Sequence, residues 1–150
     1  MPTDSSALCK FSQNLVGESA SEVELRAAGS RAYYAAYHSL LWLGEKLPPS
    51  KSHNDAMHHI GHRELQRRIV EWNTAGVHPG LARLTVLKQQ ISFALESARK
   101  FREACDYQLD ESISYNEARA QVERARKVLR HAKQLHEVVH PDADENSNAA

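Results

Sequence analysis

Apolar residues recur along most of the chain at steps of three and four positions, the spacing that places side chains on one face of an α-helix. The most regular stripe covers residues 84–105 and consists of Leu84, Leu87, Ile91, Ala94, Leu95, Ala98, Phe101 and Cys105. No segment alternates apolar and polar residues over the length of a β-strand. The pattern therefore predicts an all-α fold.

Capping and breaking residues set the ends of the first two predicted helices. A short amphipathic helix is predicted over residues 6–16. Ser21 followed by Glu24 matches a capping box, in which a hydroxyl and a carboxylate satisfy the free amides at a helix start. The second helix is predicted from there to about Leu47, because the proline pair at 48–49 cannot donate the amide hydrogen bonds that would continue it.

The rest of the chain predicts three further helices. The third is predicted from Ser52 or Asn54 to Trp72, and the glycine- and proline-containing segment 73–80 is a break. The fourth follows the apolar stripe that begins at Leu84. After a turn, the fifth is predicted over residues 115–139, before a proline.

These elements predict one domain, an antiparallel bundle of four to five helices over residues 19–140. Residues 1–18 form an N-terminal segment with the short first helix. Residues 141–150 form an acidic and polar tail, which we expect to be disordered. A length of 150 residues suits a single hydrophobic core.

Charge and composition narrow the function classes. The chain carries 19 basic and 19 acidic side chains, so any attraction to nucleic acid has to come from a local patch. No apolar run approaches the ~20 residues of a membrane span, and the N-terminus lacks the pattern of a signal peptide. We therefore expect a cytoplasmic protein with no membrane partner. The two cysteines, Cys9 and Cys105, have no CxxC spacing and are expected to be partly buried thiols, and no disulfide is expected to form in a reducing compartment.

The second predicted helix carries the densest set of chemically capable residues. Arg31 and His38 are seven positions apart, which is two helical turns or about 10.5 Å, and Tyr34 lies between them on the same face. One interpretation is structural: Arg31 is buried and pairs with a carboxylate such as Asp106, and His38 is a satisfied interior histidine. The other is that these side chains line a polar cleft or face a dimer axis.

A second set lies at the end of the fourth predicted helix. Arg99, Arg102 and Asp106 share a helix face by steps of three and four. They are either a solvated helix end with an arginine–aspartate pair, or part of a site. In the second interpretation, Arg102, Asp106 and Tyr107 meet the second helix from across the bundle.

Three sequence features together resemble the HEPN family. They are the stretch SRAYYAAYH at residues 30–38, the Ser-His connector at 52–53, and Arg102 followed by Asp106 and Tyr107 before a last amphipathic helix. The resemblance is to the short, single-domain branch of the family and covers about residues 20–138.

The resemblance implies a helical bundle that forms a homodimer, as HEPN proteins usually do. Many members are metal-independent endoribonucleases that act as toxins of toxin–antitoxin pairs or in phage defence, and nucleotidyltransferase-like proteins are common antitoxin partners. The active members carry an Arg-x4–6-His motif at a shared cleft. Histidine moves a proton, arginine holds the scissile phosphate, and the 2′-hydroxyl of the RNA attacks to leave a cyclic phosphate. No metal or cofactor is expected.

This chain departs from the motif of the ribonuclease branch, because Tyr107 rather than histidine follows Arg102 five positions later. The spacing is instead met by Arg31 and His38, and in the fifth predicted helix by the pairs Arg126 with His131 and Arg130 with His136. From this we predict a catalytic set of Arg31, His38, Arg102 and Asp106. Tyr34, Tyr107 and Arg99 are predicted to position RNA.

Other interpretations stay open at the level of sequence. The protein is alternatively a non-catalytic binding module for a nucleotide or RNA, a docking module for a nucleotidyltransferase-like partner, or a structural subunit. His58 and His62 have a spacing that can clamp a metal, but few carboxylates accompany them, which favours a solvated face and no metal. The basic residues of segment 115–139 indicate either an RNA-facing surface or an ordinary solvated face.

Overall fold

The computed structural model describes residues 4–53, 59–72 and 79–141, and within them the chain forms six helices and no strand. The helices are α1 (Ser5–Leu15), α2 (Glu22–Lys46), α3 (His62–Val70), α4 (Pro79–Ala82), α5 (Thr85–Tyr107) and α6 (Tyr115–Val139). The prediction of an all-α helical bundle is confirmed. The predicted disorder of the C-terminal tail concerns residues that lie outside the described part, apart from residue 141.

Local capping explains where the long helices begin. The side chain of Asp4 accepts a hydrogen bond from the amide of Ala7 at the start of α1, at 2.7 Å. At the start of α2, Ser21 accepts from the amide of Glu24, which is one half of the predicted capping box. A complete capping box forms at α6, where Ser114 and Glu117 bond each other's backbone amides.

The predicted start of the third helix was wrong. Residues 51 and 52 lie in a turn, residue 53 is not helical, residues 54–58 are outside the described part, and α3 begins only at His62. The amide of Ser50 donates to Glu64 at 2.9 Å and the amide of Lys51 donates to Glu71 at 3.0 Å. These two amides therefore donate to the carboxylates of Glu64 and Glu71 and do not take part in a helix. The predicted break at 73–80 also ends in a short helix, α4, which the sequence analysis did not foresee.

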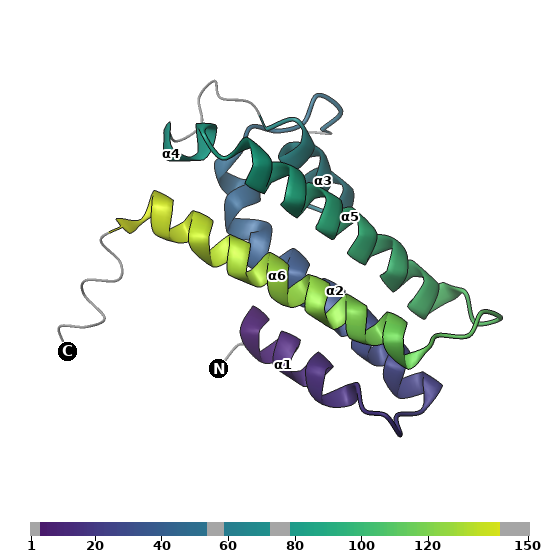
Figure 1. Ribbon diagram of the computed structural model, residues 1–150. Helices are drawn as coiled ribbons and strands as arrows, with labels where there is room; N and C mark the ends of the chain where they lie inside the picture. Colours follow the sequence, from purple (N-terminus) through teal and green to yellow (C-terminus); the bar gives the residue numbers. More distant parts are fainter. Residues whose placement is uncertain (1–3, 54–58, 73–78, 142–150) are drawn as a thin grey trace.

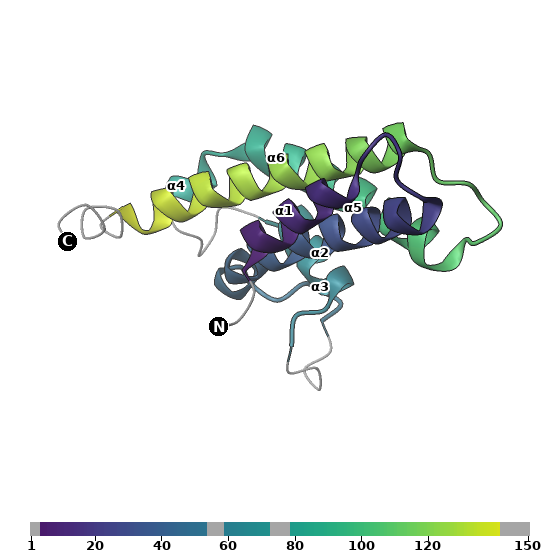
Figure 2. The ribbon, with the colours of Figure 1, turned by 90° about the horizontal axis from the view of Figure 1, so that it is seen from below.

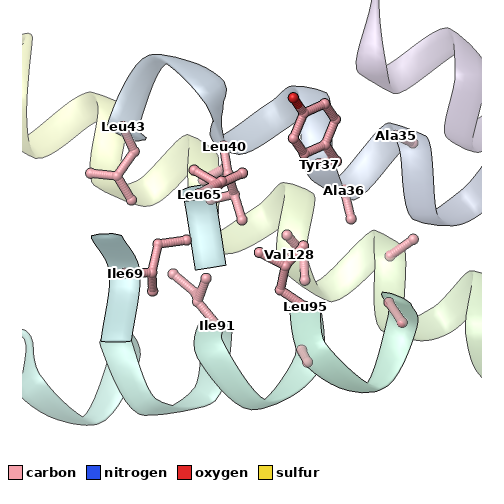
Figure 3. Close-up of a cluster of buried hydrophobic side chains, with 14 of the residues drawn as sticks. Ala35, Ala36, Tyr37, Leu40, Leu43, Leu65, Ile69, Ile91, Leu95 and Val128 are labelled. Carbon is pink, nitrogen blue, oxygen red and sulfur yellow. The ribbon is translucent and has the colours of Figure 1, made fainter. Parts of the chain in front are cut away.

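The long helices alternate in direction, and α2 is central. The chain reverses between α1 and α2 and again between α5 and α6, and α2 contacts α1, α3, α5 and α6 (Figures 1 and 2). Figure 3 shows the side chains that converge between these helices: Leu40 from α2, Leu65 and Ile69 from α3, Ile91 and Leu95 from α5, and Val128 from α6. Burial of such side chains is the main source of stability in a bundle of this size.

Two polar residues, Gln121 and Arg26, form hydrogen bonds that connect the helices. Gln121 of α6 is fully buried and donates to the carbonyl of Gly29 on α2 and to that of Ala98 on α5. Arg26 of α2 caps the C-terminal end of α5 by donating hydrogen bonds to the carbonyls of Ala104, Cys105 and Gln108. Arg26 thereby holds the last turns of α5, which carry Arg102 and Asp106.

Both cysteines are free thiols and are buried, more fully than the partial burial that the sequence predicted. Among the residues that the structure describes, no helix is long and apolar enough to cross a bilayer.

Candidate functional site

A cavity of about 430 Å³ opens between α3 and α5, beside the connection that leads into α3. Its wall is dominated by basic and imidazole side chains, namely Arg63, Arg67, Arg99, Arg102, His53, His59 and His62. The two carboxylates in the wall, Glu64 and Glu103, both have arginine partners. The cavity is therefore electropositive and suited to an anion such as a phosphate.

Arg102 is the most unusual residue in this wall, because it is buried without full hydrogen bonding. Only 8% of the residue is exposed, and its Nε has no hydrogen-bond partner among the described residues. Its nearest carboxylate oxygen is that of Asp106, at 3.7 Å, and its guanidinium lies 5.3 Å from the ring centre of Tyr33. Arg102 thus brings to the cavity wall a positive charge that is only loosely paired, which favours an anionic ligand there.

Arg99 differs from Arg102, because its charge is already compensated. It forms ion pairs with Glu96 at 2.9 Å and with Glu103 at 2.5 Å, both on α5. The pKa of Glu96 is lowered, chiefly by the hydrogen bond from Arg99. Arg99 thus contributes to the shape of the wall more than to its free positive charge.

His62 lies at the first position of α3, where it faces the aromatic side chains of α2. Its Nδ1 is 2.8 Å from the hydroxyl of Tyr33, and its ring centre is 4.2 Å from that of Tyr37. Burial, followed by the charges of Arg102, His38 and Arg99, lowers the pKa of His62 below its ordinary value. The imidazole is therefore neutral at physiological pH and able to accept a proton.

The Tyr33 hydroxyl keeps its proton in this environment. Burial raises the pKa of Tyr33 well above that of a free phenol, despite the nearby Arg102 and Arg99. The Tyr33 hydroxyl is therefore a fixed neutral partner for His62 and holds the imidazole in one orientation.

Tyr34 connects the residues that the sequence singled out. The guanidinium carbons of Arg31 and Arg102 lie 6.0 Å and 5.9 Å from its ring centre. The ring centres of His62 and His38 lie 5.7 Å and 6.5 Å from it. The structure thus places the predicted set from α2 and Arg102 of α5 around one half-buried tyrosine, together with a histidine that the prediction did not include.

The structural interpretation of Arg31 and His38 was wrong. Both residues are exposed, and among the described residues neither forms an ion pair. The carboxylate expected to pair with Arg31, that of Asp106, faces Arg102 instead. His38 does not line the cavity between α3 and α5 but a separate groove between α2 and α6.

Tyr107 lies outside the cavity. It is 74% exposed at the C-terminal end of α5, whereas Arg102 is buried. Five residues correspond to about 140° around a helix, so the two side chains leave α5 in different directions. The structure does not bring Tyr107 together with the other predicted residues.

Sequence reasoning missed His62 as a site residue, because its cluster was interpreted as a solvated face. His62 is half-buried. The one available signal was Gly61, which caps α3 and marks His62 as a first-turn residue. Within the described part of the chain, no group of three or more histidine, cysteine, aspartate or glutamate side chains is placed to hold a metal ion.

A buried hydrogen-bond network around Glu64 positions His53, another histidine in the cavity wall. Glu64 accepts hydrogen bonds from the amide and hydroxyl of Ser50 and from Arg68, which also donates to the carbonyl of Gly44. Burial alone would raise the pKa of Glu64, but the hydrogen bonds from Arg68 and Ser50 lower it to about 2. The resulting carboxylate lies 3.4 Å from Nδ1 of His53 and anchors that residue at the cavity.

Comparison of the chain with models of protein families, with curated protein sequences and with solved structures found no match.

Proposed function

We propose that this protein is a metal-independent endoribonuclease of the HEPN type and that the cavity between α3 and α5 binds the scissile phosphate. One observation carries the proposal: buried Arg102, with its unused Nε, lies in the same wall as a histidine whose pKa is lowered. An arginine for the phosphate and a neutral imidazole for a proton are the two groups that RNA cleavage without a metal requires.

In this proposal, the arginines bind the phosphate from two sides. Arg102 approaches from α5, and Arg63 and Arg67 approach from α3. Charge-assisted hydrogen bonds from guanidinium groups stabilise the extra negative charge that a phosphate gains during substitution. Asp106, 3.7 Å from Arg102, positions its guanidinium, and Tyr34 offers a ring face to a base.

His62 acts as the base and His53 as the acid. With the Nδ1 proton donated to Tyr33, the Nε2 atom of His62 takes the proton of the 2′-hydroxyl. The O2′–P bond forms and the P–O5′ bond breaks. His53, beside the Glu64 carboxylate, gives a proton to the departing 5′-oxygen. The products are a 2′,3′-cyclic phosphate and a 5′-hydroxyl, with no change in oxidation state.

Family membership, the toxin role, homodimerisation, a cognate antitoxin and a cytoplasmic location belong to the same proposal. Their support is the HEPN-like sequence at residues 30–38 and 102–107. Val86 and Phe93 are additional support for a second copy. They lie seven positions apart on one face of α5, and 68% and 76% of these residues are exposed.

The experiment that tests the proposal is cleavage of mixed cellular RNA in excess EDTA. Wild type is compared with His62→Gln and with His38→Gln, and circular dichroism checks that each variant is folded. We expect the cleavage rate of His62→Gln to be at least about a hundredfold lower than that of wild type, and we expect His38→Gln to keep most of the activity. A folded His62→Gln variant that cleaves at the wild-type rate would overturn the assignment.

A non-catalytic RNA-binding module is the second candidate. It is favoured by Tyr107, which occupies the position where the ribonuclease branch carries histidine. A module of this kind binds RNA in EDTA without cleaving it, and it loses binding in an Arg102→Gln variant. The cleavage assay therefore separates the two candidates.

A further inference from the structure

A second hollow lies on the other side of His38, between α2, the start of α1 and the C-terminal half of α6. It encloses about 600 Å³, and its wall includes Trp42, Arg130, Lys133 and His136. It shares Arg130 with an adjoining hollow between α1 and α6, which adds Lys10 and Arg126. Figure 2 shows α1 beside α2 and α6, the arrangement that frames this groove.

The groove combines an aromatic platform with positive charge. Trp42 is half-buried, and the ring of His136 meets it edge-on with the ring centres 5.0 Å apart. Arg130 and Lys133 are exposed on α6 beside them. The wall also holds the carboxylates of Asp4 and Glu137, but that of Asp4 is engaged as the cap of α1. Aromatic rings flanked by cations are the elements that hold a single-stranded nucleic acid.

Two side chains of α2 lie between the groove and the candidate site. His38 lines the groove, its ring centre is 6.5 Å from that of Tyr34, and Tyr34 in turn contacts His62. Tyr34 and Trp42 are eight residues apart on one helix, which corresponds to about 12 Å. One strand that occupies the phosphate cavity therefore reaches the groove without leaving the surface of α2.

We propose that this groove is a second RNA subsite, in which Trp42 stacks on a base of the strand and Arg130 and Lys133 hold its phosphates. The inference rests on the proposed function, because it takes the RNA that is bound at His62 as the occupant. It also accounts for the exposure of His38, because the strand passes over this residue between the cavity and the groove.

The test uses the fluorescence of Trp42 and the NMR signal of His62 in one titration. A Trp72→Phe variant leaves Trp42 as the single tryptophan, and Trp72 is buried, so the change is conservative. The probe is a single-stranded 2′-O-methyl RNA oligonucleotide, which lacks the nucleophile and stays intact. We expect the RNA to quench Trp42 and to shift the His62 signal over the same concentration range.

Variants of the groove provide the matched comparison. Arg130→Gln together with Lys133→Gln is expected to weaken binding about tenfold, whereas Lys127→Gln, an exposed cation of α6 outside the groove, leaves it unchanged. Trp42→Phe, which keeps an aromatic ring, is expected to weaken binding less than Trp42→Leu.

The outcomes separate this inference from the proposed function. A shifted His62 signal without quenching of Trp42 overturns the second subsite and leaves the phosphate cavity standing. Quenching without a shift at His62 supports the groove and counts against the cavity. No response at either residue overturns both. A change of oligomeric state in the Trp42→Leu variant, with RNA binding intact, would show instead that the groove receives a second copy of the chain.

Discussion

The hydroxyl of Tyr33 lies 2.8 Å from Nδ1 of His62 and joins the middle of α2 to the first residue of α3. This hydrogen bond spans 29 positions of sequence and fixes the imidazole in the cavity wall that also holds Arg102. It decides which nitrogen of His62 is free to face the cavity.

Removal of this hydrogen bond is expected to reduce activity without abolishing the fold. Tyr33→Phe keeps the buried ring but leaves His62 free to turn. We expect kcat for RNA cleavage to fall about tenfold, the effect of losing about one hydrogen bond in the transition state, with a smaller change in KM. Tyr107→Phe, on an exposed residue, is the control and should cleave like wild type. Equal kcat values for Tyr33→Phe and wild type would show that the hydrogen bond does not orient the base.

The titration of His62 should be displaced to low pH and should respond to its charged neighbours. Burial, followed by the charges of Arg102, His38 and Arg99, lowers its pKa from the ordinary value of 6.5. Arg99→Gln removes one of these charges, so the NMR midpoint of His62 should rise, and with it the acid limb of the pH–rate profile. Lys100→Gln, on an adjacent side chain that is 70% exposed, should leave the midpoint in place. A midpoint at or above 6.5 in wild type contradicts the assignment of His62 as a neutral base.

The lowered pKa of His62 should also make the stability of the protein depend on pH. Because the pKa of His62 is lower in the folded state than in the unfolded state, its contribution to the free energy of unfolding is complete above pH 6.5. That contribution is lost as the pH falls through the folded value. Urea unfolding at a series of pH values should therefore show a decline on acidification that is smaller in His62→Gln.

The Glu64 network should respond strongly to loss of its carboxylate. Glu64→Gln leaves Arg68, which is 8% exposed, without its counter-charge, and we expect the free energy of unfolding to fall by about 3 kcal/mol. The exposed pair of Arg126 and Glu123 is the control, and Glu123→Gln should cost less than about 1 kcal/mol. Similar losses in the two variants would contradict the structural role of Glu64.

Acid should weaken the same network. The pKa of Glu64 is about 2 in the folded protein, below its ordinary value of 4.5. Its stabilising contribution is therefore present above pH 4.5 and is lost as the pH falls toward 2. Denaturant unfolding between these pH values should show a smaller pH dependence in Glu64→Gln than in wild type.

Close packing of α2 against α5 can be tested at a glycine. A Cβ at Gly29 would lie 2.7 Å from Sγ of Cys105 and 2.7 Å from Cε1 of Phe101, whereas a Cβ at Gly17 would have no atom within 4 Å. Gly29→Ala is expected to destabilise the protein by about 1–3 kcal/mol, while Gly17→Ala should be neutral or slightly stabilising. Thermal unfolding of the two variants gives the comparison, and a stable Gly29→Ala would show that the contact is looser than described.

The sequence predicted the long helices well, because their causes are local. The ends of α2 follow from a serine cap and a proline pair, and the apolar stripe of α5 is continuous. The predicted start of α3 was wrong, because the connection before it is held by long-range contacts, such as the hydrogen bonds from the amides of Ser50 and Lys51 to carboxylates 14 and 20 positions away. No local pattern reports a partner at that distance.

The site was only partly foreseeable for the same reason. Helical phase placed Arg31, Tyr34 and His38 on one face, but which part of α2 is covered depends on how α3 and α5 pack against it. Steps of three and four placed Arg102 and Asp106 on one face of α5, and their side chains do lie 3.7 Å apart. His62 depends on Tyr33, from another helix, so it could not be derived from spacing.

The central claim, that this cavity cleaves RNA without a metal, is tested most directly with two synthetic oligonucleotides of the same sequence. One is RNA, and the other carries a 2′-O-methyl group at every position. Both are incubated with wild-type protein in excess EDTA, and the products are weighed by mass spectrometry. The account predicts that only the RNA is cut, leaving a 2′,3′-cyclic phosphate and a 5′-hydroxyl. Cleavage of both oligonucleotides, or of neither by the folded protein, would contradict it.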